Sequence, residues 1–318
     1  RAKETAALKA QAERMRNDYL AKSREQKLLT LEEARLRKFT SNWQEVDIPT
    51  PEKTGVFDWA VTVAELEPYI DWSPLFWSWE LKGLYPKIFE HPKYGEQAKS
   101  LYADARELLD RVIRENRFRP RVLVGFFPAH SDDRETVSIC DREGRELERI
   151  TFERQLEEAK TETGSPATRF SLTDFIAPKS SGRVDYLGMF AVTAGHEVEA
   201  FAQSFHRQHD DYRPLFVKTL PDRIAEAAAE SAHKRERELF GFGKGETFSL
   251  EDLLKEKYRG IRPAPGYSAC PSHAHKQKIW SLMQVEARIG LRLTESDMID
   301  PAASVSGFFF NHPSARYF

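Results

Sequence analysis

The spacing of apolar residues changes twice along the chain, which places a region of strands between two helical regions. Residues 94–114 carry Leu101, Ala105, Leu108 and Val112 on one helical face, so packing against a core explains their apolar stripe. Further on, β-branched and aromatic residues between turn signals are typical of strands. The predicted strands are residues 121–127, 136–139, 146–152 and 184–192, with a hairpin turn at 141–144.

Helical spacing precedes the strands and returns after Gly195. The predicted helices are residues 63–70, 74–81, 196–206, 222–239, 249–258 and 275–289, and residues 304–311 form a last aromatic strand. Asp71 lies between the first two helices, near the start of the second, and Pro49, Pro51 and Gly55 break the chain before them. Because strands and helices do not alternate regularly, we predict an α+β fold, a single domain with helices flanking a central, mostly antiparallel, twisted sheet.

Residues 1–40 differ from the rest because they are rich in Ala, Arg, Lys and Glu and lack proline and glycine. Their apolar residues recur at helical spacing, which predicts a charged helical lead-in before a domain at residues 41–318. The lead-in is either a linker helix lying over the domain or a basic docking surface for an acidic protein. Since the chain starts at Arg1, without a methionine, we expect it to be a fragment of a larger protein.

Composition excludes several classes of protein. With 318 residues, 40% of them apolar, the chain can bury a substantial core. A net charge of -2 provides no overall field that would attract nucleic acid or an anionic membrane. No apolar run approaches the roughly 20 residues that span a bilayer, and no signal peptide is visible. Cys140 and Cys270 are too few for a disulfide framework, so a reducing cytoplasm fits best.

Several motifs have a plainer explanation than chemistry. His273 and His275 point in different directions at a helix start and lack a second ligand cluster, so we expect surface side chains rather than metal ligands. Neighbouring aspartates at 132–133 and 210–211 lie in polar, turn-like sequence, and we interpret them as loop residues. The absence of a Gly-rich dinucleotide loop and of a phosphate-binding loop disfavours a kinase or a nicotinamide enzyme.

Residues 259–267, Arg-Gly-Ile-Arg-Pro-Ala-Pro-Gly-Tyr, form what we call the Arg-Pro loop. Two prolines and two glycines fix an extended, non-helical backbone here, which presents amides and carbonyls to a ligand. Arg262 offers a planar fork suited to a carboxylate, and Tyr267 offers an aromatic face. The loop is therefore either a small-molecule site or a purely structural connection.

Followed by Ala-Cys-Pro and a helix, the Arg-Pro loop resembles the signature of the activation domain of cobalamin-dependent methionine synthase. Other segments occur in the order of that family, and the resemblance extends over nearly the whole chain from about residue 40. These segments are Tyr-Ile-Asp-Trp-Ser-Pro at 69–74, Thr-Asp-Phe-Ile-Ala-Pro at 173–178, Asp-Tyr-Leu-Gly-Met-Phe-Ala-Val at 185–192, Asp-Arg-Ile-Ala-Glu-Ala at 222–227, Leu-Thr-Glu-Ser at 293–296 and Ser-Val-Ser-Gly-Phe-Phe-Phe-Asn-His-Pro at 304–313.

The resemblance implies a binding site for S-adenosylmethionine. Asp71 would hold the amino group and Arg262 the carboxylate, because a zwitterion needs one anionic and one cationic partner. The adenosine would lie against the Arg-Pro loop and the chain end. The full set of expected binding residues is Asp71, Glu226, Arg262, Ala264, Gly266, Tyr267, Tyr317 and Phe318. No catalytic residue and no metal ligand is expected among them, since reduced cobalt attacks the methyl carbon and the protein supplies positioning.

The sequence departs from the family pattern at three places. Ser268 stands where the family usually has proline, and Phe309 stands where tyrosine is common. The chain stops at Phe318, before the final helical segment of family members, so we expect a C-terminally truncated fragment.

The resemblance also implies cofactors and partners. In the family, inert cobalt(II) cobalamin recovers when reduction by a flavodoxin-like protein is coupled to methyl transfer from S-adenosylmethionine. Another domain of the same polypeptide would bind the cobalamin, and zinc would occur only in upstream domains, so the isolated fragment is not expected to make methionine. The alternative is a module that senses S-adenosylmethionine or docks to a partner domain without any part in methyl transfer. A third alternative is a self-contained methyltransferase with a small-molecule acceptor. It is disfavoured, because such an enzyme would normally show a Gly-rich loop after its first strand and none is visible.

Overall fold

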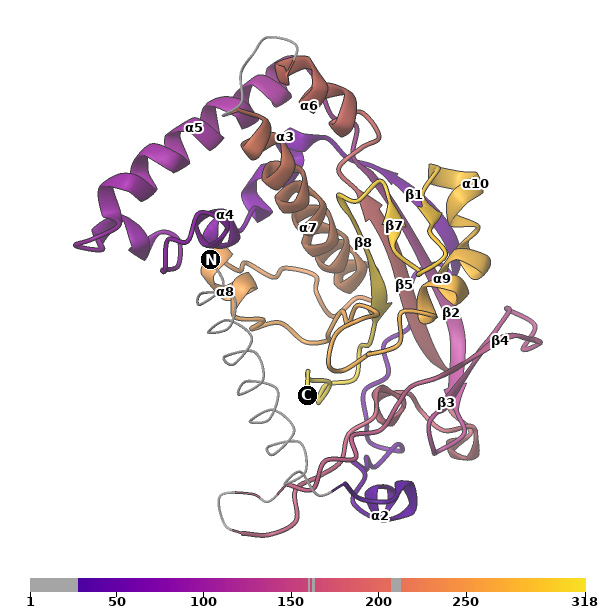
Figure 1. The fold of residues 1–318 in the computed structure, drawn as a ribbon. Helices are drawn as coiled ribbons and strands as arrows, with labels where there is room; N and C mark the ends of the chain where they lie inside the picture. Colours follow the sequence, from indigo (N-terminus) through magenta and orange to yellow (C-terminus); the bar gives the residue numbers. More distant parts are fainter. Residues whose placement is uncertain (1–27, 160, 162–163, 207–212) are drawn as a thin grey trace, which may run out of the picture.

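The computed structural model describes residues 28–159, 161, 164–206 and 213–318. Within these residues, six strands form one sheet in which every pairing is antiparallel (Figure 1). The strands are β1 (Gly55–Ala60), β2 (Arg121–Ser131), β3 (Thr136–Cys140), β4 (Glu146–Thr151), β5 (Asp185–Thr193) and β8 (Ser304–Phe309), and a separate small hairpin joins β6 (Arg292–Leu293) and β7 (Ile299–Asp300). Their order is β4-β3-β2-β5-β8, with β1 also paired to β2, which confirms the predicted α+β class.

Helices cover both faces of this sheet. The helices are α2 (Leu31–Arg35), α3 (Val63–Leu66), α4 (Ser73–Ser78), α5 (Gly95–Arg114), α6 (Val198–His206), α7 (Arg213–Leu239), α8 (Leu250–Leu254), α9 (His275–Met283) and α10 (Val285–Ile289), with 3-10 turns at Glu67–Tyr69, Lys87–Glu90, Leu172–Phe175 and Lys179–Ser181. Figure 1 shows α3 to α7 on one side of the strands and α9 and α10 on the other.

The central strands are apolar on both sides, and this allows two layers of helices to pack on one sheet. Along β2 and β5, alternate residues belong to opposite cores. Val122, Val124 and Phe190 pack with residues of α5 and α7. Leu123 and Met189 pack with residues of α9 and α10. The near-continuous apolar runs at 121–127 and 184–192 therefore reflect burial of both faces.

Most predicted elements are found within a few residues of their expected bounds, and the hairpin turn forms with Gly144 at φ +80. Strand β1 was not predicted, because prolines and a glycine precede it and only Trp59 of the strand is buried. The helix expected from residue 222 begins at Arg213, since Phe216 and Leu220, on the turns before Pro221, are buried against the core.

Two other predicted helices differ from the structure. The helix expected over residues 275–289 is divided at Gln284, whose left-handed φ of +53 ends α9 and starts α10. The helix expected over 249–258 ends at Leu254, and the chain turns with Glu256 at φ +50. In both cases a residue with positive φ interrupts a pattern that is otherwise helical.

The predicted lead-in is described only from residue 28 onward. Its described helix, α2, is capped by Thr30, whose hydroxyl accepts a hydrogen bond from the N–H of Glu33 at 3.2 Å. Residues 1–27 lie outside the described residues, as does the aspartate pair at 210–211. The long lead-in helix and the domain boundary at residue 41 therefore stay predictions.

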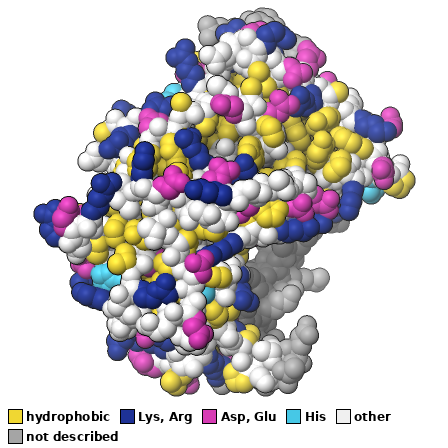
Figure 2. Space-filling model, turned by 180° about the vertical axis from the view of Figure 1, so that it is seen from behind, with side chains coloured by type: hydrophobic (Ala, Val, Ile, Leu, Met, Phe, Trp, Pro, Cys, Tyr) yellow, Lys and Arg dark blue, Asp and Glu magenta, His cyan; other side chains and the backbone are white. Residues whose placement is uncertain are grey.

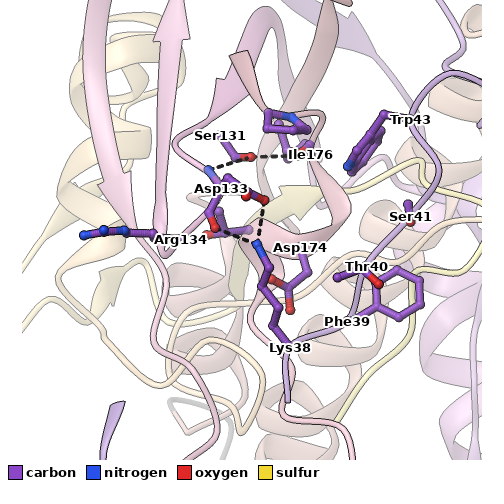
Figure 3. A pocket seen from close by; sticks show the side chains of 12 residues that line it. Lys38, Phe39, Thr40, Ser41, Trp43, Ser131, Asp133, Arg134, Asp174 and Ile176 are labelled. Carbon is purple, nitrogen blue, oxygen red and sulfur yellow. Dashed lines mark hydrogen bonds and ion pairs between the residues drawn. The ribbon is translucent and has the colours of Figure 1, made fainter. Parts of the chain in front are cut away.

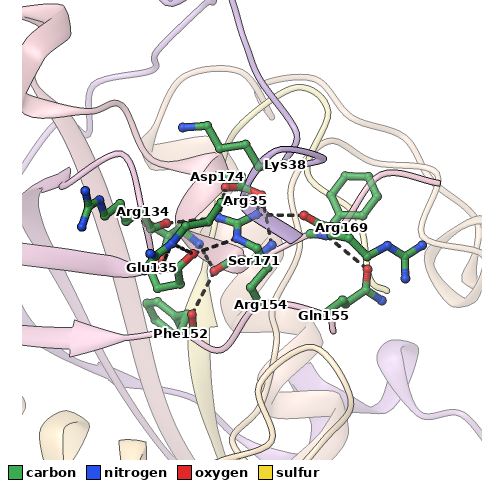
Figure 4. A network of polar contacts seen from close by, with 12 residues as sticks. Arg35, Lys38, Arg134, Glu135, Phe152, Arg154, Gln155, Arg169, Ser171 and Asp174 are labelled. Atoms are coloured by element: carbon green, nitrogen blue, oxygen red, sulfur yellow. Dashed lines mark hydrogen bonds and ion pairs between the residues drawn. The ribbon is translucent and has the colours of Figure 1, made fainter. Parts of the chain in front are cut away.

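A chain of ion pairs attaches α2 to the sheet domain (Figure 4). Arg35 contacts Glu135 at 2.5 Å, and Glu135 also contacts the fully buried Arg154 at 2.8 Å. Both outer nitrogens of Arg154 then bond the carboxylate of Asp174 at 2.7 Å. Burial raises the pKa of Asp174 even though Arg154 opposes this effect. The network stabilises α2 on the domain only as long as every buried charge keeps its partner.

The surface combines charges of both signs. Figure 2 shows Lys and Arg side chains interspersed with Asp and Glu over the back of the molecule. This face therefore has no large field of one sign, in keeping with the near-neutral net charge. Among the described helices, none has the length and apolar character needed to cross a membrane.

Candidate functional site

The Arg-Pro loop is attached to the outer edge of the sheet, beside β8. Ile261 and Phe310 exchange two backbone hydrogen bonds of 3.0 Å, and the N–H of Phe308 donates to the carbonyl of Pro263 at 3.0 Å. The close approach requires a glycine in β8, since a Cβ at Gly307 would lie 2.7 Å from the Pro263 oxygen. The sheet edge thus fixes the position of the residue between these contacts, Arg262.

The end of the Arg-Pro loop is a tight turn. The N–H of Gly266 donates to the carbonyl of Cys270 at 2.8 Å, and the N–H of Cys270 donates to the carbonyl of Tyr267 at 2.9 Å. Gly266 has φ +107, and a Cβ there would lie 2.4 Å from Cε1 of His273. The backbone conformation therefore favours glycine, and any larger residue would also displace the exposed His273 ring.

Arg262 is the central cation of the site. Its Nη1 lies 2.7 Å from Oε2 of Glu230 and donates to the Tyr258 hydroxyl at 2.5 Å. Its backbone N–H donates to the hydroxyl of Tyr317 at 3.0 Å. The Arg262 side chain is 20% exposed and that of Glu230 only 8%. The ion pair is thus mostly buried, and part of the Arg262 side chain remains exposed.

The protonation states around Arg262 follow from burial and charge. Burial lowers the pKa of Arg262, but the attraction of Glu230 and of the neighbouring tyrosines outweighs it, so the net shift is upward and the guanidinium stays charged. Burial raises the pKa of Tyr317 to about 12 and also raises that of Tyr258. Burial holds the pKa of His233 well below its ordinary value, so this ring is neutral. Arg262 and Glu230 therefore place a cation and an anion in direct contact at the centre of the cluster.

Two adjoining cavities open beside the loop, with volumes of about 330 and 470 Å³. Both are lined by Glu226, Ala264 and Tyr267, and the smaller one also by Arg262 and Tyr317. Helix α7, the Arg-Pro loop, β8 and the chain end all contribute to their walls. Together they fall within the range of about 300–1,000 Å³ that is usual for small-molecule sites.

The structure brings five of the eight expected binding residues together at these cavities. Gly266 lies in the turn of the same loop but does not line them. Asp71 lies just before α4, which packs on α7; its carboxylate accepts the N–H of Ser73 at 2.9 Å and lines neither cavity. The ring of Phe318 stacks on Phe170 with centroids 5.6 Å apart. The roles assigned to Asp71 and Phe318 thus rest on the resemblance alone.

The sequence reasoning missed Glu230, His233 and Tyr258, which surround Arg262. A signal was present in the printed sequence: Glu226, Glu230 and His233 recur at spacings of four and three on an otherwise alanine-rich helix. Polar residues at this spacing share one face of a helix. Because α7 is buried, a polar stripe on it requires partners, and the Arg-Pro loop supplies them.

The expectation for the histidine pair was half wrong. His273 is exposed, but His275 is only 9% exposed and packs edge-on against Phe152 with centroids 5.3 Å apart. His275 precedes Ile279 and Met283 on the face of α9 that covers the sheet, which is why it is buried. Of the residues that the structure describes, none form a group of three or more side chains able to hold a metal ion.

A second hollow, of about 290 Å³, lies between the residues that follow α2 and the loop after β2 (Figure 3). Lys38 bonds the carboxylate of Asp133 at 2.6 Å and its carbonyl at 2.9 Å. Asp174 belongs to the ion-pair network of Figure 4, and the hydroxyl of Ser131 donates to the carbonyl of Ile176. Because these groups satisfy one another, the cavities beside Arg262 are the stronger candidate site. The aspartate pair at 132–133 lies in a loop, as predicted.

Comparison with known proteins decides the family. A sequence model of the vitamin B12 dependent methionine synthase activation domain matches residues 62–318. The chain belongs to this family of activation domains. The crystal structure of the MetH reactivation domain bound to AdoHcy is 43% identical in sequence, with a TM-score of 0.86, and the match covers 92% of this chain and 89% of that one. The activation domain described here is therefore part of a methyltransferase, methionine synthase, and its fold is the single domain that the sequence predicted.

Proposed function

We propose that this activation domain binds S-adenosylmethionine in the cavities beside the Arg-Pro loop and supplies its methyl group for the remethylation of cob(II)alamin. The observation that carries the proposal is the state of Arg262. Its side-chain contacts with Glu230 and Tyr258 use Nη1, while Nε and Nη2 have no hydrogen-bond partner among the described residues. Arg262 lines the smaller cavity. A guanidinium with two free nitrogens fits a carboxylate with two parallel hydrogen bonds.

The remaining groups suit the rest of such a ligand. Tyr267, which is 69% exposed, and Tyr317 offer aromatic surface for an adenine ring. Glu226 lines both cavities and offers a negative charge to a sulfonium or ammonium group. The similar MetH reactivation domain was crystallised with AdoHcy, which supports a ligand of this class.

The residue roles in this proposal follow the family motifs. Asp71 binds the amino group and Arg262 the carboxylate. The adenosine lies against Ala264, Gly266 and Tyr267 and the chain end at Tyr317 and Phe318, and Glu226 completes the site.

The chain's own residues bind and orient the methyl donor and exclude water, and no side chain acts as a nucleophile. Cobalamin, bound by another domain of the same polypeptide, supplies the cobalt that accepts the methyl group. A flavodoxin-like protein of the cytoplasm supplies the electron.

Calorimetric titration with S-adenosylmethionine and S-adenosylhomocysteine tests the proposal. We expect Arg262→Ala to weaken binding by about 2–5 kcal/mol, because a charge-assisted contact to the carboxylate is lost and Glu230 is left unpaired. Arg259→Ala is the matched control, since Arg259 lies on the same loop but contacts Asp47 and the Asn311 carbonyl. Urea unfolding of each variant shows whether the fold persists. No saturable binding to the wild-type domain, or unchanged affinity of Arg262→Ala, would contradict the proposal.

A further inference from the structure

The hydroxyl of Tyr258 is the second group that holds the Arg262 guanidinium. We infer that Tyr258 is a positioning residue of the proposed S-adenosylmethionine site, one that orients Arg262 and so makes the site selective for ligands with a free carboxylate. The inference rests on the proposed function, because it concerns the ligand that Arg262 receives. Tyr258 does not line either cavity, so it acts through Arg262 and not by touching the ligand.

The geometry shows why one contact would not be enough. Glu230 alone holds Nη1 through one oxygen, at 2.7 Å, and the guanidinium could rotate about that contact. The Tyr258 hydroxyl accepts a hydrogen bond from the same nitrogen at 2.5 Å and lies 3.5 Å from Oε2 of Glu230. Two partners on Nη1 leave the Arg262 guanidinium less freedom to rotate than one partner would. The Arg262 guanidinium is then already oriented before a ligand arrives, so less conformational entropy is lost on binding.

The ring of Tyr258 is itself held on two sides. The guanidinium of Arg237 lies over the ring with 4.1 Å to the centroid, and the His233 ring meets it edge-on at 5.0 Å. The residue is 8% exposed. Because the ring is held in place, its hydroxyl has a defined position. The Arg262 side chain is long and flexible and needs such a partner to hold its orientation.

The surroundings give the hydroxyl no other strong partner. His233 is neutral, and its Nδ1 lies 3.5 Å from Nη1 of Arg262, at the limit of a hydrogen bond. Glu230 has a second oxygen, Oε1, which is buried without a hydrogen-bond partner among the described residues. The Tyr258 hydroxyl therefore serves the Arg262–Glu230 pair and nothing else that the structure describes.

Tyr258→Phe removes this hydroxyl and keeps the ring with its contacts to Arg237 and His233. We expect the dissociation constants of S-adenosylmethionine and S-adenosylhomocysteine to rise at least about fivefold, the effect of losing one hydrogen bond to a charged group. The probe 5′-methylthioadenosine has the adenosine but no carboxylate, and its affinity should stay within about twofold of the wild-type value. A purely structural role would weaken all three ligands alike.

A double-mutant cycle separates the inference from the proposed function. In an Arg262→Ala background, Tyr258→Phe should have no further effect on any ligand. If Arg262→Ala weakens binding but Tyr258→Phe leaves all affinities unchanged, or weakens 5′-methylthioadenosine equally, the inference is overturned and the proposed function stands. If neither substitution changes the affinity for S-adenosylhomocysteine, the proposed function itself fails. Urea unfolding confirms that each variant is folded before titration.

Discussion

Gly307 links the sheet edge to the ligand-binding loop, and Gly307→Ala tests that link. The glycine lies in β8 opposite Phe190 and does not have a positive φ, so alanine introduces no backbone strain. Its new Cβ would lie 2.7 Å from the carbonyl oxygen of Pro263 and 2.8 Å from Cε1 of Phe190. Phe190 cannot yield easily, because its ring stacks on Phe309 with centroids 4.9 Å apart. The loop must therefore move.

The size of the movement follows from the contact distance. Ordinary van der Waals contacts of a Cβ begin near 3.4 Å, so the Pro263 oxygen must retreat by about 0.7 Å from its 2.7 Å position. Pro263 adjoins Arg262, and the shift displaces the guanidinium from its Tyr258 and Glu230 contacts. Overpacking of this kind lowers the free energy of unfolding by about 1–3 kcal/mol. We expect the dissociation constant of S-adenosylhomocysteine to rise about tenfold, or about 1.4 kcal/mol.

Gly188→Ala is the matched control. Gly188 lies in β5 and also lacks a positive φ, but its Cβ would meet the Phe309 side chain at 2.8 Å instead of the loop. Urea unfolding should show a similar loss of stability for both variants, whereas calorimetry should show weakened binding only for Gly307→Ala. Equal affinity losses would mean that the sheet as a whole, and not the loop contact, sets the affinity. Wild-type stability and affinity of Gly307→Ala would refute the reasoning.

Two further predictions concern stability. Arg154→Met leaves the buried carboxylates of Glu135 and Asp174 without their shared partner. We expect urea titration to show that the free energy of unfolding falls by about 3–5 kcal/mol. A decrease below about 1 kcal/mol would contradict the role of the network. Burial lowers the pKa of His312 to about 4. Between about pH 6.5 and 4 the unfolded chain therefore binds a proton that the folded chain does not. The free energy of unfolding should decrease as the pH falls through this window, by at most about 3 kcal/mol. His312→Asn should flatten this part of a pH series of urea titrations, and an unchanged slope would show that another group is responsible.

The sequence predicts the elements whose pattern is strong. The long helix α5 and the central strands have clear apolar spacing. The predicted bounds of α5 and β5 agree with the structure to within one residue, whereas β2 extends four residues further than predicted, to Ser131. Strand β1 could not be predicted, because Trp59 is its one buried residue and the apolar pattern is therefore weak. Its position depends on its pairing with β2. His275 was misjudged because both histidines were interpreted alike as surface side chains. The direction of a side chain at a helix start depends on which face of the helix meets the sheet.

The candidate site shows the same division. Arg262, Tyr267 and Tyr317 could be identified from motif and resemblance, and all three line the cavity. Glu230 and Tyr258 could not, because they reach Arg262 only when α7, the segment after α8 and the Arg-Pro loop are folded together. A polar side chain inside an alanine-rich helix signals a buried partner but does not say which one.

The order of residues in the Arg-Pro loop explains why a cavity forms at this edge. The N–H of Ile261 donates to the carbonyl of Phe310, and the carbonyl of Ile261 accepts from the N–H of Phe310. The loop therefore starts as an added strand beside β8. Two residues later, Pro263 has no N–H and cannot donate to β8. Its carbonyl accepts a hydrogen bond from the N–H of Phe308. Pairing ends there and the chain leaves the sheet. Arg262, between the two, has its N–H directed away from β8 and bonded to Tyr317. The proline thus ends the added strand at the point where the cavity lined by Arg262 begins.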